Sequence, residues 1–139
     1  MVRALLLLLC AMAWAHDAAA PAESANVLIL TDANFEETLQ KHEYVLVKFY
    51  APWCGHCKHL APEYAKAADA LQEQGSKTAL ANLDATVEKA TAAKFNIRGY
   101  PTLILFKNGQ EQEKYSGART AEAIAAFMQE KAGEKKGDL

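Results

Sequence analysis

Residues 53–58 read Trp53-Cys54-Gly55-His56-Cys57-Lys58 and directly follow the mostly apolar run Val45 to Tyr50. An apolar run followed by a Cys-x-x-Cys pair predicts a strand that leads into the first turn of a helix. At a helix N-terminus a sulfur faces unpaired backbone N–H groups and the positive end of the helix dipole. Both lower the pKa of the thiol, and the thiolate is the form that attacks disulfides. The pair is therefore a candidate redox site.

Hydrophobic periodicity on both sides of this junction predicts further strands and helices. We expect strands at 27–30, 44–50, 78–83, 102–106 and 113–115, and helices at 34–40, 54–74, 88–95 and 120–131. Asp32 or Asn34 can cap the first helix, and Asn108-Gly109 predicts a hairpin turn. The order βαβαβαββα implies one α/β domain over residues 26–132, with a central mixed sheet and helices on both faces.

The N-terminus has the pattern of a secretory signal peptide over residues 1–15. Arg3 supplies the positive charge, residues 4–14 are apolar, and Ala13-Trp14-Ala15 is a cleavage site, with cleavage as late as residue 20 as a variant. The apolar run is shorter than the roughly 20 residues of a membrane span, which disfavours an anchor. Residues 16–25 are expected to form a disordered leader. Cleavage would remove Cys10 and leave only Cys54 and Cys57, in an oxidising compartment.

Cysteine number and charge argue against several other classes of protein. A secreted disulfide scaffold spreads several cysteine pairs along the chain, and one small ring contributes little to stability. Zinc needs about four ligands, and a single pair with His56 or His59 does not match that pattern. The formal net charge is −2 without a basic block, so no nucleic acid is expected as a partner. We also expect no metal, no organic cofactor and no membrane association.

Three separated motifs resemble a catalytic a-type domain of the protein disulfide isomerase family, in the thioredoxin superfamily. They are Phe49-Tyr50-Ala51-Pro52-Trp53-Cys54-Gly55-His56-Cys57-Lys58, Leu60-Ala61-Pro62-Glu63-Tyr64 and Arg98-Gly99-Tyr100-Pro101-Thr102. The resemblance covers residues 26–131 and implies the thioredoxin fold. It also implies a thiol–disulfide oxidoreductase and isomerase that forms, reduces and rearranges disulfide bonds in folding secretory proteins.

The resemblance assigns roles to the residues of the Cys-Gly-His-Cys motif. Cys54 is the attacking thiolate, and Cys57, one helical turn later, is the resolving thiol that releases a trapped mixed disulfide. Gly55 and His56 separate them, and an imidazole can stabilise the neighbouring thiolate and make the disulfide a better oxidant. Isomerase-type sites have potentials near about −180 mV, against about −270 mV for thioredoxin. An exposed His56 without a role is the alternative.

A second segment, Tyr100-Pro101, is expected to face the cysteines. Members of the family keep a cis-proline there, and the backbone before it can pair with an extended substrate. Trp53 and Tyr100 are expected to frame an apolar contact surface for unfolded chains, or else to be partial core residues.

Lys48 and Arg119 are expected to tune the site. Relatives usually carry a buried Glu or Asp at the position of Lys48 as proton acceptor for the second cysteine. Lys48 is either a proton carrier of depressed pKa, a charge that stabilises thiolate, or an ammonium that reaches solvent without a catalytic role. Arg119 matches the family arginine that moves toward the resolving cysteine, or is a surface charge before the last helix.

The tail at 133–139 ends in Lys136-Gly137-Asp138-Leu139, which resembles a Lys-Asp-Glu-Leu retrieval signal, although Gly137 departs from it. The expected location is the endoplasmic reticulum lumen, with a retrieval receptor as partner, or secretion without that signal. Unfolded cysteine-containing proteins, and glutathione or an oxidase, are the other expected partners. The alternative functions are a dedicated reductase or electron carrier, and a non-enzymatic chaperone-like binding module.

Overall fold

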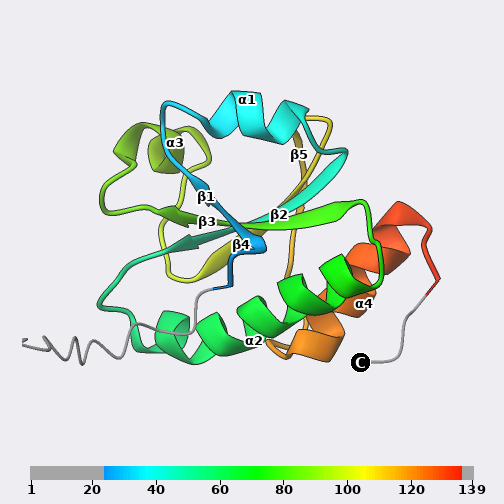
Figure 1. The fold of residues 1–139 in the computed structure, drawn as a ribbon. Coiled ribbons are helices and arrows are strands. Elements are labelled where there is room, and N and C mark those ends of the chain that lie inside the picture. The colour runs from blue at the N-terminus through cyan, green and yellow to red at the C-terminus, as the bar shows by residue number, and fades with distance from the viewer. Residues whose placement is uncertain (1–23, 136–139) are drawn as a thin grey trace, which may run out of the picture.

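A mixed β-sheet runs through the centre of the molecule and separates two pairs of helices (Figure 1). This computed structural model describes residues 24–135. The predicted signal peptide at 1–15, nearly all of the predicted leader at 16–25 and the last four residues of the tail lie outside the described residues. The elements are β1 (Val27–Leu30), α1 (Phe35–Gln40), β2 (Tyr44–Tyr50), α2 (Gly55–Glu73), β3 (Thr78–Asp84), α3 (Lys89–Lys94), β4 (Thr102–Lys107), β5 (Gln110–Lys114) and α4 (Ala121–Ala132).

The strands lie in the order β1-β3-β2-β4-β5. β1, β3 and β2 are parallel, whereas β4 is antiparallel to β2 and β5 is antiparallel to β4. The expected mixed sheet with helices on both faces is confirmed: α1 and α3 cover one face, and α2 and α4 cover the other (Figure 1). β2 lies in the middle and is buried on both faces, as its apolar sequence predicted.

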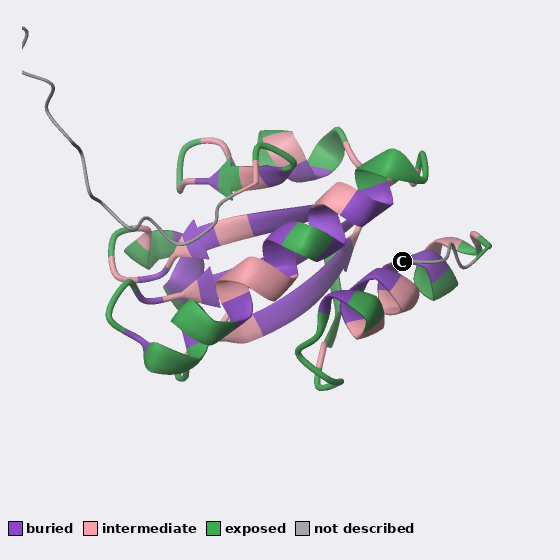
Figure 2. Cartoon of the chain, turned by 60° about the horizontal axis from the view of Figure 1, so that its bottom comes forward, coloured by how far each residue is buried: buried purple, intermediate pink, exposed green. Residues whose placement is uncertain are grey.

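Side chains of β2 alternate between two cores. Val47 and Phe49 pack toward α1 and α3, in a cluster that includes Phe35 and Leu39 of α1. Leu46 packs toward α2 and α4, in the cluster that holds Leu60, Tyr64 and Leu71 of α2 with Ile124 and Met128 of α4. Figure 2 shows buried residues along the central strands and on the helix sides that face them. The junction between β2 and α2 is thereby fixed by packing on both sides.

The long helix α2 begins at Gly55 and ends at Glu73, within one residue of the predicted limits. Its end is formed by Gly75, whose φ of +68° suits a residue without Cβ, and by the bond from the Ser76 N–H to the Leu71 carbonyl at 2.9 Å. Charged residues line its outer face. Within residues 24–135, none of the helices combines the length and hydropathy needed to cross a bilayer.

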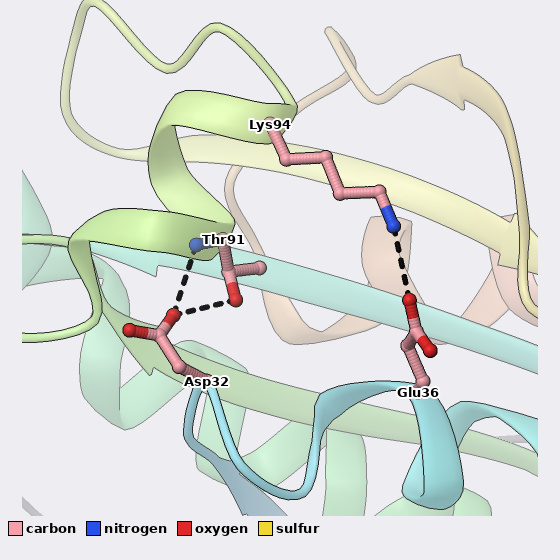
Figure 3. Close-up of polar contacts among 4 residues, drawn as sticks. All are labelled: Asp32, Glu36, Thr91 and Lys94. Carbon is pink, nitrogen blue, oxygen red and sulfur yellow. Dashed lines mark hydrogen bonds and ion pairs between the residues drawn. The ribbon is translucent and has the colours of Figure 1, made fainter.

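Of the two predicted caps of α1, Asn34 is confirmed in position and Asp32 is wrong. Asn34 occupies the N-cap position without a capping side-chain bond, because its Oδ1 accepts instead from the backbone N–H of Thr31 at 2.7 Å. Asp32 binds the neighbouring helix: its Oδ1 accepts from the backbone N–H and the hydroxyl of Thr91, at 2.9 and 2.7 Å (Figure 3). These bonds lower the pKa of Asp32 and tie the loop before α1 to α3.

The last strand is also corrected, from the predicted 113–115 to Gln110–Lys114. Asn108 and Gly109 both have positive φ, at 49° and 78°, which is the geometry of a two-residue hairpin turn. Such a turn starts the return strand at once, so Gln110 already pairs with Lys107. The start of this strand was missed because its residues are polar and exposed and so give no hydrophobic pattern.

Candidate active site

The predicted redox pair lies where β2 runs into α2. Cys54 is the N-cap of α2, with its backbone N–H bound to the Ala51 carbonyl at 3.1 Å and its own carbonyl accepting from Lys58 at 3.1 Å. Its sulfur accepts a hydrogen bond from the backbone N–H of Cys57 at 3.2 Å. A sulfur therefore occupies the position that Ser, Thr or Asp usually takes at a helix start.

Both sulfurs are free thiols, and both residues are buried, at 8% exposed for Cys54 and 4% for Cys57. Although Cys54 stands at a helix start, it is recessed between Trp53 and Gly55, which are exposed. The reason is that the loop containing Tyr100 covers it, since the Cys54 sulfur lies 3.5 Å from the Tyr100 carbonyl oxygen. Only a small part of Cys54 is therefore exposed.

The surroundings of Cys54 favour its thiolate. Burial by itself raises the pKa of Cys54, but hydrogen bonds from the Cys57 thiol and from the Cys57 and His56 backbone N–H groups reverse this effect. The positive charge of Arg119 adds to them. The net pKa of Cys54 lies below its ordinary value, and more of this thiol is ionised at neutral pH.

The surroundings of Cys57 have the opposite effect. Burial raises the pKa of Cys57 to about 11, helped by its hydrogen bond to Cys54 and by the negative charge of that neighbour. The backbone of Ala51 and the charge of Lys48 act against this rise. One thiol of the pair is therefore poised to attack, and the other keeps its proton.

The segment Tyr100-Pro101 lies beside the cysteines. The Tyr100–Pro101 peptide bond is cis, as expected, and Tyr100 packs against the cluster of Ala51, Cys54 and Cys57. The rings of Trp53 and Tyr100 meet edge to face, with centroids 5.7 Å apart. Trp53 is 70% exposed, so it is not a core residue. The two rings present aromatic surface beside the Cys54 sulfur.

Lys48 lies below this site, on β2. Its side chain is only 4% exposed, so the interpretation as an ammonium reaching solvent is wrong. The reason is packing: the Nζ of Lys48 lies 4.6 Å from the ring centroid of Tyr64 and 5.6 Å from that of Tyr50. Tyr50 in turn packs against the two cysteines. The charge of Lys48 lowers the pKa of Cys57.

Arg119, His56 and His59 are exposed. Arg119 precedes the N-cap of α4, and its charge lowers the pKa of Cys54. His56 reaches Cys54 through its backbone N–H, while its residue is exposed, as is His59. Within residues 24–135, no three His, Cys, Asp or Glu side chains gather closely enough to hold a metal ion.

Two residues that support the site were not predicted. The hydroxyl of Tyr64 lies 2.6 Å from the Leu46 carbonyl and 2.9 Å from the Ala81 carbonyl, so it bridges β2 and β3 beneath Lys48. Burial raises the pKa of Tyr64. Asn82 is the register partner of Lys48 on β3. The available signal was an Asn at an alternate position of a buried strand, where a polar side chain needs a partner.

Comparison with known proteins places this geometry among relatives. The sequence pattern of the thioredoxin family matches residues 26–130. The chain is 54% identical over 112 residues to "Protein disulfide-isomerase 1" of Caenorhabditis elegans, covering 81% of this chain and 23% of that protein. It is 47% identical over 134 residues to "Protein disulfide-isomerase" of Gallus gallus, covering 95% of this chain and 26% of that protein. The chain thus spans about a quarter of the length of these relatives.

Solved structures agree with the sequence comparison. The first thioredoxin domain of mouse protein disulfide-isomerase A4 superposes with a TM-score of 0.72 at 41% identity, covering 84% of this chain and 83% of that one. The zinc-bound form of human ERp44 gives a TM-score of 0.72 at 30% identity, covering 75% of this chain and 30% of that one.

Proposed function

This chain belongs to the thioredoxin family, in its protein disulfide isomerase branch, and we propose that it is a thiol–disulfide oxidoreductase and isomerase. It forms, reduces and rearranges disulfide bonds in cysteine-containing client proteins. The observation that carries the proposal is the asymmetry of the pair. The pKa of Cys54 is lowered and that of Cys57 is raised to about 11, although the two residues are one helical turn apart.

This asymmetry supports a two-step exchange in which each cysteine has its own part. The Cys54 thiolate attacks a client disulfide, a bond forms between Cys54 and one client sulfur, and the other client sulfur leaves as a thiolate. Cys57 then loses its proton to solvent and attacks the Cys54 sulfur. The bond to the client breaks, the client keeps the electron pair, and Cys54 and Cys57 are joined as a disulfide. The reverse sequence oxidises a client dithiol.

The wall beside Cys54 supports binding of an extended, partly unfolded client. The exposed ring of Trp53 and the ring of Tyr100 offer apolar contact area. The backbone at Tyr100, next to the cis-proline Pro101, offers polar groups to a peptide strand that lies across the site. Binding of this kind depends on backbone and aromatic contacts, so it does not require one particular client sequence.

The tuning roles of Gly55, His56, Lys48 and Arg119 belong to the same proposal. Arg119 contributes positive charge to the attacking thiolate and Lys48 to the resolving thiol, and these effects support their assignment. His56 supplies a backbone N–H next to Gly55, and its imidazole stabilises the thiolate when protonated.

The proposed location is the endoplasmic reticulum lumen, where oxidising conditions allow the pair to cycle. The apolar N-terminal segment and the Lys136-Gly137-Asp138-Leu139 ending support this location. There the pair exchanges electrons with glutathione or an oxidase, and a retrieval receptor reads the tail. A reporter protein that is normally secreted is expected to stay in the cell when it carries this tail. Efficient secretion of the tagged reporter would indicate that the protein is secreted.

The reduction potential of the Cys54–Cys57 pair, with refolding of a protein whose disulfides are scrambled, tests the function. We expect a potential near about −180 mV and recovery of the native client in a glutathione buffer. A potential near about −270 mV would indicate the dedicated reductase or electron carrier instead. A variant with both cysteines replaced by serine is expected to lose all activity. Refolding that survives this replacement would indicate the chaperone-like binding module.

A further inference from the structure

Lys48 and Asn82 are neighbours across the two central parallel strands. The register of β2 and β3 pairs Leu46 with Leu80 and, two residues on, Lys48 with Asn82. Leu46 and Leu80 both belong to the core beneath α2 and α4. Because side chains alternate along a strand, Lys48 and Asn82 point to that same face. The sheet therefore places an amide next to a buried lysine, on the side that carries the two cysteines.

The amide of Asn82 has an unused acceptor. Its Oδ1 is buried and accepts no hydrogen bond from any residue that the structure describes. Buried acceptors of this kind are rare in folded proteins, and each calls for a physical reason. An ammonium group has three donors and no acceptor, so it is the natural complement of such an oxygen. The structure holds no hydrogen bond from Lys48 to this oxygen, but paired strands lie about 4.8 Å apart, which is within the reach of a lysine side chain.

Lys48 is connected to the resolving cysteine through two aromatic rings. Its Nζ lies over the ring of Tyr64 at 4.6 Å, and Tyr64 stands two turns after Cys57 on the same side of α2. It also lies 5.6 Å from the ring of Tyr50, which packs against the cluster that contains Cys57. The aromatic faces favour a cation at this position, because a ring face carries negative charge density.

We propose that Asn82 is a positioning residue that keeps Lys48 charged and directed beneath Cys57, and that this charge stabilises the Cys57 thiolate in the resolving step. The inference rests on the proposed exchange reaction. In that step the Cys57 proton passes to water, since an ammonium cannot accept it. The thiolate then attacks the Cys54 sulfur, the bond from Cys54 to the client sulfur breaks, and the client leaves as a thiolate with the electron pair.

Other charged and titratable groups lie around this face. The rings of Tyr50 and Tyr64 lie near the Nζ of Lys48, and in the reduced pair Cys54 contributes a negative charge that raises the pKa of Cys57. Asp84, at the end of β3, directs its Oδ1 to the backbone and hydroxyl of Thr86. The Cys54 charge is absent once Cys54 is joined to the client, whereas the positive charge of Lys48, which lowers the pKa of Cys57, remains.

A double-mutant cycle in the full chain tests the proposal. The variants are Lys48→Met, Asn82→Leu and the two combined, with Asn82→Ala as a second removal of the amide. The matched control is Leu103→Val, which alters the apolar neighbour of Lys48 on β4. Each protein is prepared as the mixed disulfide of Cys54 with glutathione, and release of glutathione by Cys57 is followed between pH 6 and 9. Far-UV circular dichroism checks that each variant is folded.

We expect Lys48→Met and Asn82→Leu each to slow release about tenfold at fixed pH, because loss of a nearby opposite charge raises a thiol pKa by about one unit or more. The double variant should be no slower than Lys48→Met alone, since Asn82 acts through Lys48. Titration of the Lys48 side chain by NMR should show a lower pKa in Asn82→Leu and Asn82→Ala. Leu103→Val should match the original protein.

Two results would overturn the proposal. One is unchanged release in both Asn82 variants; the other is an equal slowing by Asn82→Leu when Lys48 is already methionine. The release step is intramolecular and uses glutathione, so it is measured whether or not scrambled clients refold. A failure of the proposed client function is therefore distinguishable from a failure of this inference.

Discussion

The backbone N–H of Cys57 donates to the sulfur of Cys54 across 3.2 Å, so the peptide group of one cysteine stabilises the reactive form of the other. The Cys-x-x-Cys spacing makes this possible, because an N-cap side chain accepts from the third residue of the helix. In the same turn of α2, Cys57 is buried. One local geometry thus produces two thiols of unlike acidity.

The first prediction concerns the order of attack. Cys57→Ser is expected to accumulate a stable mixed disulfide between Cys54 and a cysteine-containing peptide, because nothing remains to resolve it. Mass spectrometry of the unreduced protein measures this species. Cys54→Ser is the matched control and should accumulate little. An equal yield of adduct through Cys57 would contradict the assigned roles.

The second prediction concerns pH. The rate of Cys54 alkylation by iodoacetamide should rise with pH, because the thiolate is the reacting form. The midpoint of this rise should lie below that of an ordinary cysteine, because the pKa of Cys54 is lowered. Alkylation of Cys57 should keep rising toward a midpoint near 11, where that thiol finally ionises. Peptide mapping after short pulses separates the two. A common midpoint for both sulfurs would be inconsistent with this structure.

The third prediction concerns Arg119. Arg119→Gln should raise the pKa of Cys54 and slow its alkylation near neutral pH, because a positive charge that favours the thiolate is removed. Since Arg119 is exposed, salt should reduce the difference between the two proteins, with a screening length of about 8 Å at physiological ionic strength. Arg98→Gln, an exposed arginine in another loop, is the control. A difference that persists at high salt would argue for a structural effect.

The fourth prediction concerns the bridge between β2 and β3. Tyr64→Phe removes a fully buried hydroxyl that bonds to the backbones of both strands, and should lower the free energy of unfolding by about 1–3 kcal/mol. Urea unfolding measures it. Tyr44→Phe, at the half-buried start of β2, should cost clearly less. Equal losses of unfolding free energy in the two variants would mean that the Tyr64 hydroxyl does not stabilise the pairing of β2 and β3.

The fifth prediction compares the two contacts in Figure 3. Asp32→Ala should lower the melting temperature more than Glu36→Ala, because Asp32 accepts two hydrogen bonds from Thr91, whereas Glu36 makes one exposed ion pair with Lys94. The Asp32 contribution is present above the ordinary carboxyl pKa and is lost as pH falls through the lowered pKa. Melting curves from neutral to acidic pH should converge for the original protein and Asp32→Ala.

The sequence predicted those parts of the fold that depend on local pattern. The limits of α2 followed from its apolar spacing and from Gly75, and the hairpin turn followed from Asn108 and Gly109. The length of β5 did not, because an exposed edge strand needs no apolar residue. Asp32 was wrong as a cap of α1 because its partner is Thr91, which is distant in sequence.

The candidate site divides in the same way. Cys54 and Cys57 were recognisable from their spacing, and the cis bond before Pro101 from the family resemblance. The recessed position of Cys54 was missed, because Tyr100 approaches it from another loop. The place of Asn82 beside Lys48 depends on strand register, which no single segment encodes.

The N-cap position of Cys54 also couples oxidising power to resistance against unfolding. A thiolate at that position strengthens the start of α2, and a disulfide-bonded sulfur is a poorer acceptor with no charge. The reduced protein should therefore be the harder of the two forms to denature. Folding and reduction form a closed thermodynamic cycle. The difference between the unfolding free energies of the reduced and oxidised forms therefore sets, through the two electrons transferred, the difference in reduction potential between the folded and the unfolded chain. A pair of denaturation curves would thus measure how strongly folding makes this protein take electrons.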